Sequence, residues 1–520
     1  MIEKYLNNRL LTLYLFPLLL GSIATLSFQP FNLTLINFVI LPLFFYLIIY
    51  INQKSKSLYR KKPHKKNLFI FGTLFGFGYF LSGIHWITNS LTFDETFKIL
   101  IPFGLIIIPL FLSLFFSIII SIAGPYLKMN LSSLFFFSGC LAFSDYLRAK
   151  ILSGFPWNLW SYSFSWATEI LQILNKFGLF AFNLISITLF MLPTVIFFKK
   201  SLRVKYLTFL ALFTLLLISY LYGSHSINEN QKNLSNYNEK FNIKIISPNF
   251  NLEYNLSKVK IQDRLKKLIR FSQPDKNLKT LFVWPEGVFS GYSYDEILYL
   301  KNIFSKNFSK NHFILFGVNK KSVGSEGVYN SLIIVNNQMK ILQEYKKQKL
   351  VPFGEFLPLE NTLNKFGFKK ITEGHGSFLK GKIQNNLIVD NLNILPLICY
   401  ELIFTKLTQS SHEDTNVIIN ISEDGWFGNS IGPYQHFAKG IFRAIENNTF
   451  VLRSANKGIS AIINNKGEVI RMLNPREAGN IELEVPLLKG ENKNKNDLIF
   501  FFLLFTYIFI FSFLQRNNEK

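Results

Sequence analysis

The sequence has very few cysteines: only Cys140 and Cys399 occur among its 520 residues. Cys140 lies within an apolar run and Cys399 in a more polar region, so a disulfide framework is not expected. The seven histidines are scattered singly, and no cysteine or histidine pair has the spacing of a zinc site. We therefore expect neither a metal nor another cofactor.

Acidic residues are also scarce, because 32 Asp and Glu stand against 56 Lys and Arg and give a formal net charge of +24. A strongly basic chain can indicate a nucleic-acid partner. Here, however, many basic residues lie in short loops between apolar runs, where positive charge orients membrane helices. We therefore expect an integral membrane protein with no nucleic-acid partner.

Long apolar runs dominate the first half of the chain. Hydrophobic residues make up 49% of the sequence, and 57 of them are Phe. Runs of about 20 residues, enough to span a bilayer, occur near residues 10–28, 33–51, 67–87, 99–124, 131–149, 181–198, 204–223 and 497–514. No small-residue cleavage site follows the first run, so a signal peptide is not expected. We predict a seven-span transmembrane domain over residues 1–223, and a C-terminal transmembrane helix with a cytoplasmic tail over residues 493–520.

The charges of the loops predict an orientation. The loop after the second run is rich in Lys and Arg between residues 54 and 66, and the loop at 199–205 is also basic. The loop after the third run contains Asp94 and Glu95. Because basic loops stay in the cytoplasm, we expect both chain ends there and residues 224–492 on the outer side.

Residues 224–492 have a different composition. Short apolar runs rich in Ile, Val and Phe alternate with polar stretches, as in NIKIISP (242–248) and NILPLICYE (393–401). Such runs, bounded by turn residues, are typical of buried strands, and residues 257–272 between two of them have a helical pattern. We predict an α/β domain with a sheet buried on both faces.

Three polar residues stand at or just after strand-like runs: Glu286 in LFVWPEG, Lys347 in EYKKQKLVPFGE and Cys399 in NILPLICYE. A thiol, a carboxyl and an ammonium group supply the nucleophile, proton carrier and oxyanion stabiliser that acyl transfer through a thioester requires. Together with the apolar runs, this pattern indicates an acyltransferase that works on lipid at a membrane surface.

Each of these residues also has a simpler interpretation. Cys399 could be a buried structural thiol, Glu286 a helix cap or surface acid, and Lys347 part of a solvated lysine face. The segment LVPFGEF after Lys347 favours close packing instead, and Glu355 within it could hold the lysine or join the acid–base chemistry. The chain turns polar directly after Cys399, which is typical of a strand-to-helix corner that exposes a nucleophile.

These motifs resemble the carbon–nitrogen hydrolase (nitrilase) superfamily, whose Glu-Lys-Cys triad lies on an αββα sandwich. More narrowly, the chain resembles the bacterial apolipoprotein N-acyltransferase family, which joins such a domain to eight membrane spans. The matching segments include GSIATLSFQPFN (21–32), DYLRAKILSGFPWNLWSYS (145–163), SEDGWFGNSIGPYQHF (422–437) and ENNTFVLRSANKGISA (446–461). The resemblance implies a polytopic α-helical membrane domain and a nitrilase-like αββα catalytic domain over residues 224–492.

The resemblance also implies roles for individual residues. Glu286 matches the general base, Lys347 the oxyanion stabiliser, Cys399 the nucleophile and Glu355 a second essential acid. Four further residues match the surroundings of the family's site: Tyr400 and Glu401 beside the nucleophile, and Trp426 and Phe427 as an aromatic pair near the pocket.

The chain departs from the family pattern at three places. Glu423 stands where the family usually has Asn, and the first strand of the domain ends in Ser247-Pro248-Asn249 instead of QGN. A family tryptophan on the following loop has no clear equivalent, and Tyr254 is the nearest aromatic residue. These departures concern contacts of the substrate loops and leave the triad intact.

The family's reaction is a ping-pong acyl transfer. The resemblance therefore implies a membrane phospholipid as acyl donor and the N-terminal amine of a diacylglyceryl-cysteine apolipoprotein as acceptor, in the final step of lipoprotein maturation. It implies a location in the bacterial inner membrane, with the catalytic domain facing the periplasm. We expect a monomer, because no feature of the sequence demands an oligomer.

Two other interpretations stay open. A membrane-tethered amidase or nitrilase would use the same three residues and release its acyl group to water, so the triad does not separate it from a transferase. A catalytically silent binding or transport protein is disfavoured, because the apolar runs are nearly free of the polar residues that line a transport pathway.

Overall fold

The computed structural model describes residues 6–55, 63–253, 256–322, 324, 326–358, 360, 377–383, 385–409, 414–490 and 496–517. Most of the lysine-rich loop after the second apolar run, and Tyr254, lie outside these residues. The chain forms two compact units. Unit 1 contains Met1–Asn89, Lys98–Ser226 and Lys495–Lys520, and unit 2 contains Ser90–Phe97 and Ile227–Asn494.

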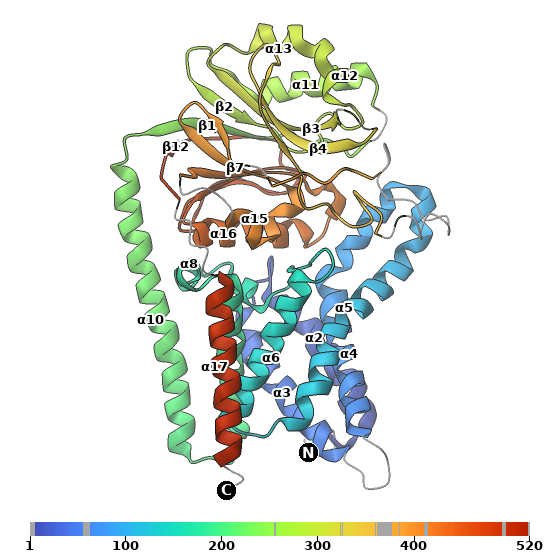
Figure 1. Cartoon of the computed structure of the whole chain (residues 1–520), viewed down its shortest axis with the longest axis vertical. Helices are drawn as coiled ribbons and strands as arrows, with labels where there is room; N and C mark the ends of the chain where they lie inside the picture. Colours follow the sequence, from blue (N-terminus) through green and yellow to red (C-terminus); the bar gives the residue numbers. More distant parts are fainter. Residues whose placement is uncertain are drawn as a thin grey trace. The chain divides into compact units, whose positions relative to one another are not determined.

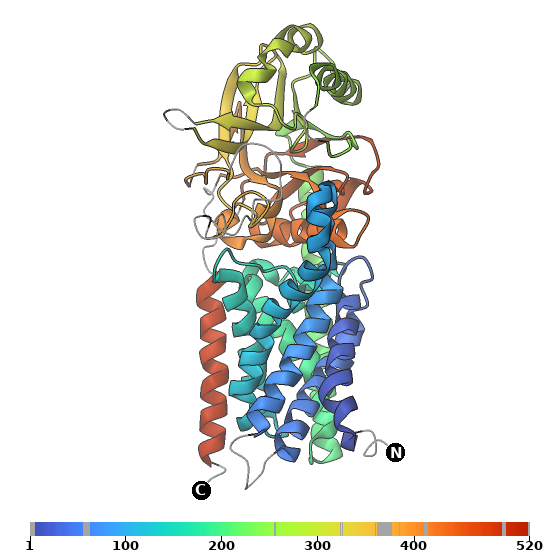
Figure 2. The same ribbon diagram turned by 90° about the vertical axis from the view of Figure 1, so that its right-hand side faces the viewer.

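Unit 1 consists of apolar helices, most of which run side by side, whereas the long helix at residues 202–235 stands apart from them in Figure 1 and continues into unit 2 from Ile227 on (Figure 2). Its helices are α2 (Phe16–Ala24), α3 (Asn37–Lys54), α4 (Pro63–Ile84), α5 (Ile101–Ala123), α6 (Leu131–Lys150), α7 (Thr168–Leu171), α8 (Leu174–Phe177), α9 (Leu179–Met191), α10 (Leu202–Ser235) and α17 (Asn496–Asn517). Small residues let neighbouring helices approach closely. A Cβ at Gly21 of α2 would lie only 2.0 Å from the backbone oxygen of Phe75, and one at Gly78 of α4 only 2.2 Å from that of Leu18.

Six helical segments among the described residues are long and apolar enough to cross a membrane: Thr34–Lys54, His64–Phe93, Glu95–Tyr126, Leu179–Phe197, Leu202–Ser235 and Asp497–Leu514. The sequence predicted eight spans, so the structure does not confirm two of them. The predicted span at 10–28 forms an apolar helical segment of only Leu11–Ser27. The other, at 131–149, is helix α6 (Leu131–Lys150), whose apolar sequence is interrupted by serines and by the charged residues Asp145, Arg148 and Lys150.

The charged residues of α6 are paired inside the bundle. Arg148 donates to a carboxylate oxygen of Asp145 at 2.8 Å, and the Asn183 amide donates to the other oxygen at 3.0 Å. Arg148 also donates to the backbone oxygens of Phe155 and Asn158. Ionisable groups in an apolar bundle are tolerated when they are paired in this way. The network therefore joins α6 and α9 to the segment that follows α6.

Unit 2 contains two mixed six-stranded sheets. The first has the strand order β12-β1-β2-β3-β4-β5, and the second has the order β11-β10-β9-β8-β7-β6. The strands of the first are β1 (Lys240–Ser247), β2 (Thr280–Val283), β3 (His312–Lys321), β4 (Val328–Val335), β5 (Ile341–Lys346) and β12 (Gly479–Pro486). Those of the second are β6 (Leu387–Val389), β7 (Leu392–Ile398), β8 (Val417–Glu423), β9 (Phe450–Asn456), β10 (Ser460–Ile463) and β11 (Val469–Leu473).

The two sheets of unit 2 pack face to face. One apolar core combines side chains of both, including Ile243 and Leu332 from the first sheet and Ile419 and Leu452 from the second. The outer face of the first sheet is covered by α11 (Lys258–Ser272), α12 (Tyr294–Ile297) and α13 (Lys301–Asn307). Helices α15 (Thr405–Gln409) and α16 (Gly432–Asn447) lie on the second sheet's side, where α16 contacts β9 and β10. The layers therefore follow the order α, β, β, α (Figure 1).

The central strands of both sheets correspond to the continuous apolar runs in the sequence. Strands β1, β2 and β3 pair in parallel, as do β7, β8 and β9. Because a helix covers one face and the other sheet covers the opposite face, side chains on both faces are buried. Parallel strands also end at the same edge, so residues that follow different strands meet there.

Candidate active site

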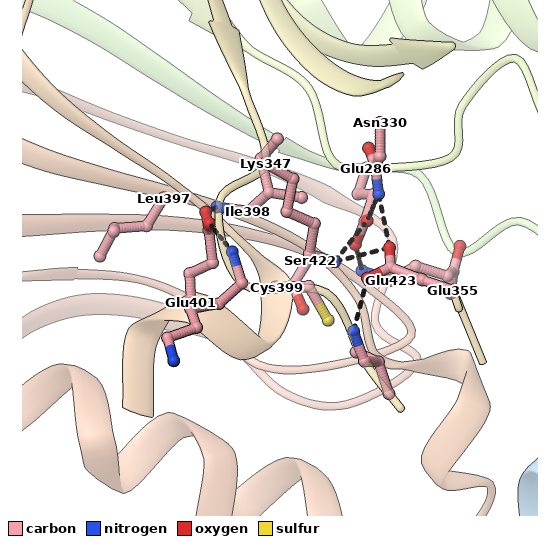
Figure 3. A network of polar contacts seen from close by, with 12 residues as sticks. Glu286, Asn330, Lys347, Glu355, Leu397, Ile398, Cys399, Glu401, Ser422 and Glu423 are labelled. Atoms are coloured by element: carbon pink, nitrogen blue, oxygen red, sulfur yellow. Dashed lines mark hydrogen bonds and ion pairs between the residues drawn. The ribbon is translucent and has the colours of Figure 1, made fainter. Parts of the chain in front are cut away.

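The ends of three strands bring together the residues that the sequence singled out. Glu286 follows β2 by three residues, Lys347 follows β5 directly, and Cys399 follows β7 directly. The first two strands belong to one sheet and β7 to the other, so the site lies where the two sheets face each other. Figure 3 shows the Cys399 sulfur beside the cluster formed by Glu286, Lys347 and Glu355.

Two carboxylates hold the Lys347 ammonium group. Its Nζ lies 2.8 Å from Glu355 Oε1 and 3.5 Å from Glu286 Oε1. The Asn330 amide of β4 donates to the same oxygens of Glu286 and Glu355, in both cases at 2.8 Å. The Lys347 side chain is only 1% exposed. Burial alone would lower its pKa, but the two carboxylates outweigh that effect and raise it above the usual value, so the lysine stays charged.

The backbone at Cys399 has an unusual conformation. Its φ is +50°, a left-handed value that residues with a Cβ rarely adopt, at the point where β7 passes into a short 3-10 helix (Cys399–Ile403). The Asn420 side chain donates to the backbone oxygens of Leu397 and Cys399 at 3.2 and 3.3 Å. Such local strain persists only where the surroundings stabilise it, as they do in many active sites. Cys399 therefore lies on a tight corner between strand and helix, as the sequence predicted.

The Cys399 thiol is neutral in this environment. Burial is the main cause that raises its pKa, the Glu286 carboxylate adds to it, and Lys347 acts in the opposite direction. A thiol must lose its proton to act as a nucleophile. A neighbouring base is therefore needed, and Glu286 is the carboxylate that most strongly affects this thiol.

Glu401 connects the strand ends that carry Lys347 and Cys399. Its Oε1 accepts from the backbone N–H of Gln348 at 2.6 Å and of Lys349 at 2.9 Å, and its Oε2 accepts from the N–H of Ile398 at 2.8 Å. The Tyr345 hydroxyl lies 3.0 Å from both oxygens. Burial raises the pKa of Glu401 to about 7, although the backbone donors oppose that shift. Glu401 therefore links the two sheets through buried hydrogen bonds.

The remaining aromatic candidates pack against other rings of the same unit. The described ring pairs are Tyr400 with Phe404 at 5.0 Å, Trp426 with Phe93 at 5.2 Å, and Phe427 with His436 at 5.5 Å. Phe93 lies far away in the sequence, in the short Ser90–Phe97 segment that belongs to unit 2. The predicted place of Trp426 and Phe427 near a substrate pocket stays a prediction.

Glu423, one of the departures from the family pattern, contacts the candidate base Glu286. Its backbone N–H donates to Glu286 Oε2 at 3.1 Å, and its own carboxyl accepts from the Gly425 N–H at 2.9 Å and from the Asn456 amide at 2.8 Å. Burial raises the pKa of Glu423 to about 8, and the carboxylates of Glu286 and Asp424 add to the shift. At neutral pH the side chain is therefore mostly uncharged, as an asparagine would be.

Replacement of Glu423 by Gln is expected to flatten the pH dependence of stability. The pKa of Glu423 is about 8 in the folded protein against an ordinary value of 4.5. The folded state therefore holds the proton more tightly, and the free energy of unfolding falls as the pH rises from about 5 to about 9. Glu423→Gln should remove that part of the fall, on the order of 3–5 kcal/mol. The melting temperature of the detergent-solubilised protein across this pH range measures it.

The exposed Glu484→Gln variant is the matched control for this prediction, because Glu484 lies on the solvent side of β12. It should follow the wild-type curve. Parallel curves for Glu423→Gln and the wild type would contradict the buried, protonated state of Glu423.

Sequence reasoning missed Asn330, although it lies at the centre of the carboxylate–lysine cluster. The available signal was a polar residue within an apolar strand, VYNSLIIV, since buried polar side chains usually satisfy a specific partner. Among the described residues, no group of three or more His, Cys, Asp or Glu side chains is arranged to hold a metal ion.

Two family models match the sequence. The model of the apolipoprotein N-acyltransferase N-terminal domain matches residues 20–192, and the carbon–nitrogen hydrolase model matches residues 262–489. The chain is also similar to solved structures of nitrilase superfamily proteins. A nitrilase superfamily member from Saccharomyces cerevisiae is 16% identical, with a TM-score of 0.36 over 48% of this chain and 91% of that one. An amidase from Nesterenkonia sp. AN1 is 15% identical, with a TM-score of 0.34 over 47% and 90%.

Relatives that span the whole chain are more informative. Apolipoprotein N-acyltransferase from Rickettsia prowazekii (strain Madrid E) is 32% identical over 478 residues, which cover 90% of this chain and 91% of the relative. The protein of the same name from Rhodopseudomonas palustris is 28% identical over 484 residues, covering 90% and 88%. The similarity therefore includes the apolar helices as well as the two-sheet unit. The chain belongs to the apolipoprotein N-acyltransferase family.

Proposed function

We propose that this enzyme moves a fatty acyl chain from a membrane phospholipid to the N-terminal amine of a diacylglyceryl-cysteine lipoprotein, through a thioester on Cys399. The observation that carries the proposal is the cluster of buried Lys347 and Glu355 with the partly buried Glu286, beside a thiol on a left-handed backbone corner. It combines a base, a fixed cation and a nucleophile within one site.

The first half of the reaction forms the thioester. Glu286 takes the proton from the Cys399 thiol, and the sulfur attacks an ester carbonyl of the phospholipid. The fixed charge of Lys347, with a backbone N–H at the corner, stabilises the negative oxygen of the tetrahedral intermediate. The ester C–O bond then breaks, and the lysophospholipid alkoxide receives the proton from Glu286.

The second half transfers the acyl chain. The uncharged α-amine of the lipoprotein attacks the thioester carbonyl, and Glu286 accepts a proton from the nitrogen. As the C–S bond breaks, the Cys399 sulfur leaves as a thiolate and takes the proton back from Glu286. The products are an N-acylated lipoprotein and the free thiol, so the enzyme returns to its starting state.

The cluster distances support a division of roles between the two acids. Lys347 lies closer to Glu355, at 2.8 Å, than to Glu286, at 3.5 Å. Glu355 is further held by the Val351 N–H at 2.9 Å. We assign Glu355 to holding the lysine, which leaves Glu286 available for proton transfer. Glu401 then positions the two strand ends, and Tyr400, Trp426 and Phe427 line the pocket for the acyl chain.

The apolar helices of unit 1, which include α17, support a membrane location. The helices α5, α10 and α17 expose many large apolar side chains, among them Ile107, Phe213 and Phe509. Exposed apolar surface on this scale is stable in contact with lipid and not with water. We assign the chain eight spans in the bacterial inner membrane, with residues 1–223 and 493–520 forming the membrane part and residues 224–492 a catalytic domain in the periplasm, and a monomeric state.

Intact-mass spectrometry of the purified protein after incubation with phospholipid tests this function. We expect an added fatty-acyl mass that hydroxylamine removes, because a thioester reacts with it. A chase with a diacylated lipopeptide should move the acyl chain to the peptide amine. Release of free fatty acid in place of acylated peptide would overturn the transferase function and favour an amidase-like hydrolase, and the absence of any adduct with or without acceptor would overturn the thioester.

A further inference from the structure

We propose that a connected series of four buried side chains, Asn420, Arg453, Asp424 and Ser422, positions the Cys399 nucleophile. Asn420 binds the backbone carbonyl of Cys399 at one end of the series, and Ser422 acts on its sulfur at the other end. These four side chains are called the backing network below. The inference rests on the proposed function in that Cys399 is the nucleophile. Sequence reasoning did not single out any of the four.

The carbonyl end of the backing network begins at Asn420, in the middle of β8. Its amide nitrogen donates to the backbone oxygen of Cys399 at 3.3 Å and to that of Leu397 at 3.2 Å. Its amide oxygen accepts a hydrogen bond from the Arg453 guanidinium of β9. Because the amide is held on both sides, the carbonyl of Cys399 has a fixed partner that favours the left-handed backbone.

The centre of the backing network is a buried ion pair. Arg453 Nη2 lies 2.7 Å from Asp424 Oδ2 and 2.9 Å from Oδ1, and both side chains are fully buried. His436 Nδ1 lies 3.1 Å from the same Oδ1. Burial alone would raise the pKa of Asp424, but Arg453 and His436 outweigh it and hold the pKa below its usual value. Asp424 is therefore a carboxylate that accepts hydrogen bonds.

The sulfur end is set by the register of the parallel strands. Ile398 of β7 pairs with Ile421 of β8, so the next residues, Cys399 and Ser422, lie side by side at the strand ends, as Figure 3 shows. The Ser422 hydroxyl donates to Asp424 Oδ1 at 2.7 Å. The Ser422 side chain also acts on the Cys399 thiol, because it opposes the rise that burial causes in the pKa of that thiol, so its hydroxyl lies near the sulfur. The backing network therefore reaches Cys399 at both of its ends.

The single proton of the Ser422 hydroxyl determines what this residue does during the reaction. A serine hydroxyl has one proton and two lone pairs. While that proton goes to Asp424, the oxygen faces the neutral thiol as an acceptor. When Glu286 removes the thiol proton, the hydroxyl turns and donates to the thiolate, and Asp424 keeps its bonds to Arg453 and His436. The only covalent change is the transfer of the proton from the Cys399 sulfur to Glu286, the Ser422 O–H bond stays intact, and the thiolate gains a charge-assisted hydrogen bond.

A purely structural role is the simpler alternative, since an ion pair between β8 and β9 also holds two strands together. It predicts that loss of the Ser422 hydroxyl affects stability alone. Ser454 is the matched control, because it is equally buried, pairs with Ile421 from the neighbouring strand, and donates to the backbone oxygen of Ile246 at 2.8 Å, outside the network.

The test compares Ser422→Ala with Ser454→Ala in full-length protein that also carries Cys140→Ser, so that Cys399 is the only thiol. The rate of alkylation by iodoacetamide between pH 7 and pH 9.5 reports the thiolate population. We expect Ser422→Ala to lower that rate about tenfold at each pH, which corresponds to one hydrogen bond to a charged group. Ser454→Ala should match the parent protein.

Acyl-enzyme formation from phospholipid gives a second readout. Ser422→Ala should slow it by about ten- to a hundredfold, with melting temperatures similar for both variants. An alkylation rate that is unchanged or higher in Ser422→Ala than in Ser454→Ala would overturn the proposal. Because alkylation needs no lipid substrate, this result stands even if the protein forms no acyl-enzyme, so failure of the network and failure of the proposed function are distinguishable.

Discussion

Replacement of Cys399 by serine is expected to abolish the acyl adduct and to lower turnover by about four orders of magnitude or more. The change leaves the shape of the corner intact but substitutes a hydroxyl, whose proton Glu286 is too weak a base to remove at the required rate. Loss of the nucleophile in enzymes that use a covalent intermediate has effects of this size. Intact mass after incubation with phospholipid, together with the rate of lipopeptide acylation, measures both effects.

Cys140→Ser is the matched control, because Cys140 is the other cysteine of the sequence and lies in helix α6 of unit 1. It should acylate and turn over as the wild type does. An acyl adduct on Cys399→Ser, or its loss from Cys140→Ser alone, would contradict the assignment of the nucleophile.

Replacement of Lys347 by methionine is expected to impair both folding and catalysis. Methionine keeps most of the side-chain volume but removes the positive charge that lies 2.8 Å from Glu355 and 3.5 Å from Glu286. The carboxylates of buried Glu355 and partly buried Glu286 are then left facing each other, which should destabilise the protein by about 3–5 kcal/mol. Loss of the oxyanion partner should also lower the rate of acyl-enzyme formation by about 10²–10³-fold.

The neighbouring Lys346→Met is the matched control for this variant. Lys346 is the last residue of β5, and its side chain is 33% exposed and 3.9 Å from Glu344. Surface ion pairs of this kind contribute little to stability, so Lys346→Met should unfold and react as the wild type does. Melting temperature and single-turnover acylation distinguish the two lysines, and equal effects of both substitutions would contradict the buried role of Lys347.

A site of this kind suits a thioester intermediate. The Lys347 ammonium, the Glu401 carboxyl and the Asp424–Arg453 pair are all buried, so their charges act through protein with little screening by water. A thioester reacts with water as well as with an amine, and a site that excludes water favours the amine. Transfer as opposed to hydrolysis therefore requires that water be kept from the thioester until the amine binds.

Much of the candidate site could be predicted from the sequence because its residues follow strands. Glu286 and Cys399 come just after the buried apolar strands β2 and β7, and Lys347 comes just after β5, most of whose side chains are partly exposed. Parallel strands end at one edge of a sheet. Asn330 and Arg453 were missed because each lies inside a strand, where the sequence shows an interrupted apolar run and not the partner that the interruption serves. The partner is distant in the sequence, since Arg453 of β9 contacts Asp424, which follows the neighbouring strand β8.

Two of the eight predicted spans are not confirmed by the structure, for a physical reason of the same kind. Apolar length is a local property, and six described segments satisfy it. Helix α6 departs from it, since it carries Asp145 and Arg148 as a buried pair bound to Asn183 of α9. Whether such a helix is compatible with an apolar bundle depends on its neighbours, which a hydropathy pattern does not contain.

By itself, the sequence determined the class of the protein, the apolar helices, the buried strands and the three candidate reactive groups, because these depend on composition and on short patterns along the chain. The tertiary structure decided which of these groups contact one another and which form ion pairs. It placed Lys347 nearer to Glu355 than to Glu286, joined two strand ends through Glu401, and set Ser422 beside Cys399. Distances between residues far apart in the chain follow from strand register and sheet packing, and those arise only when the whole core is formed.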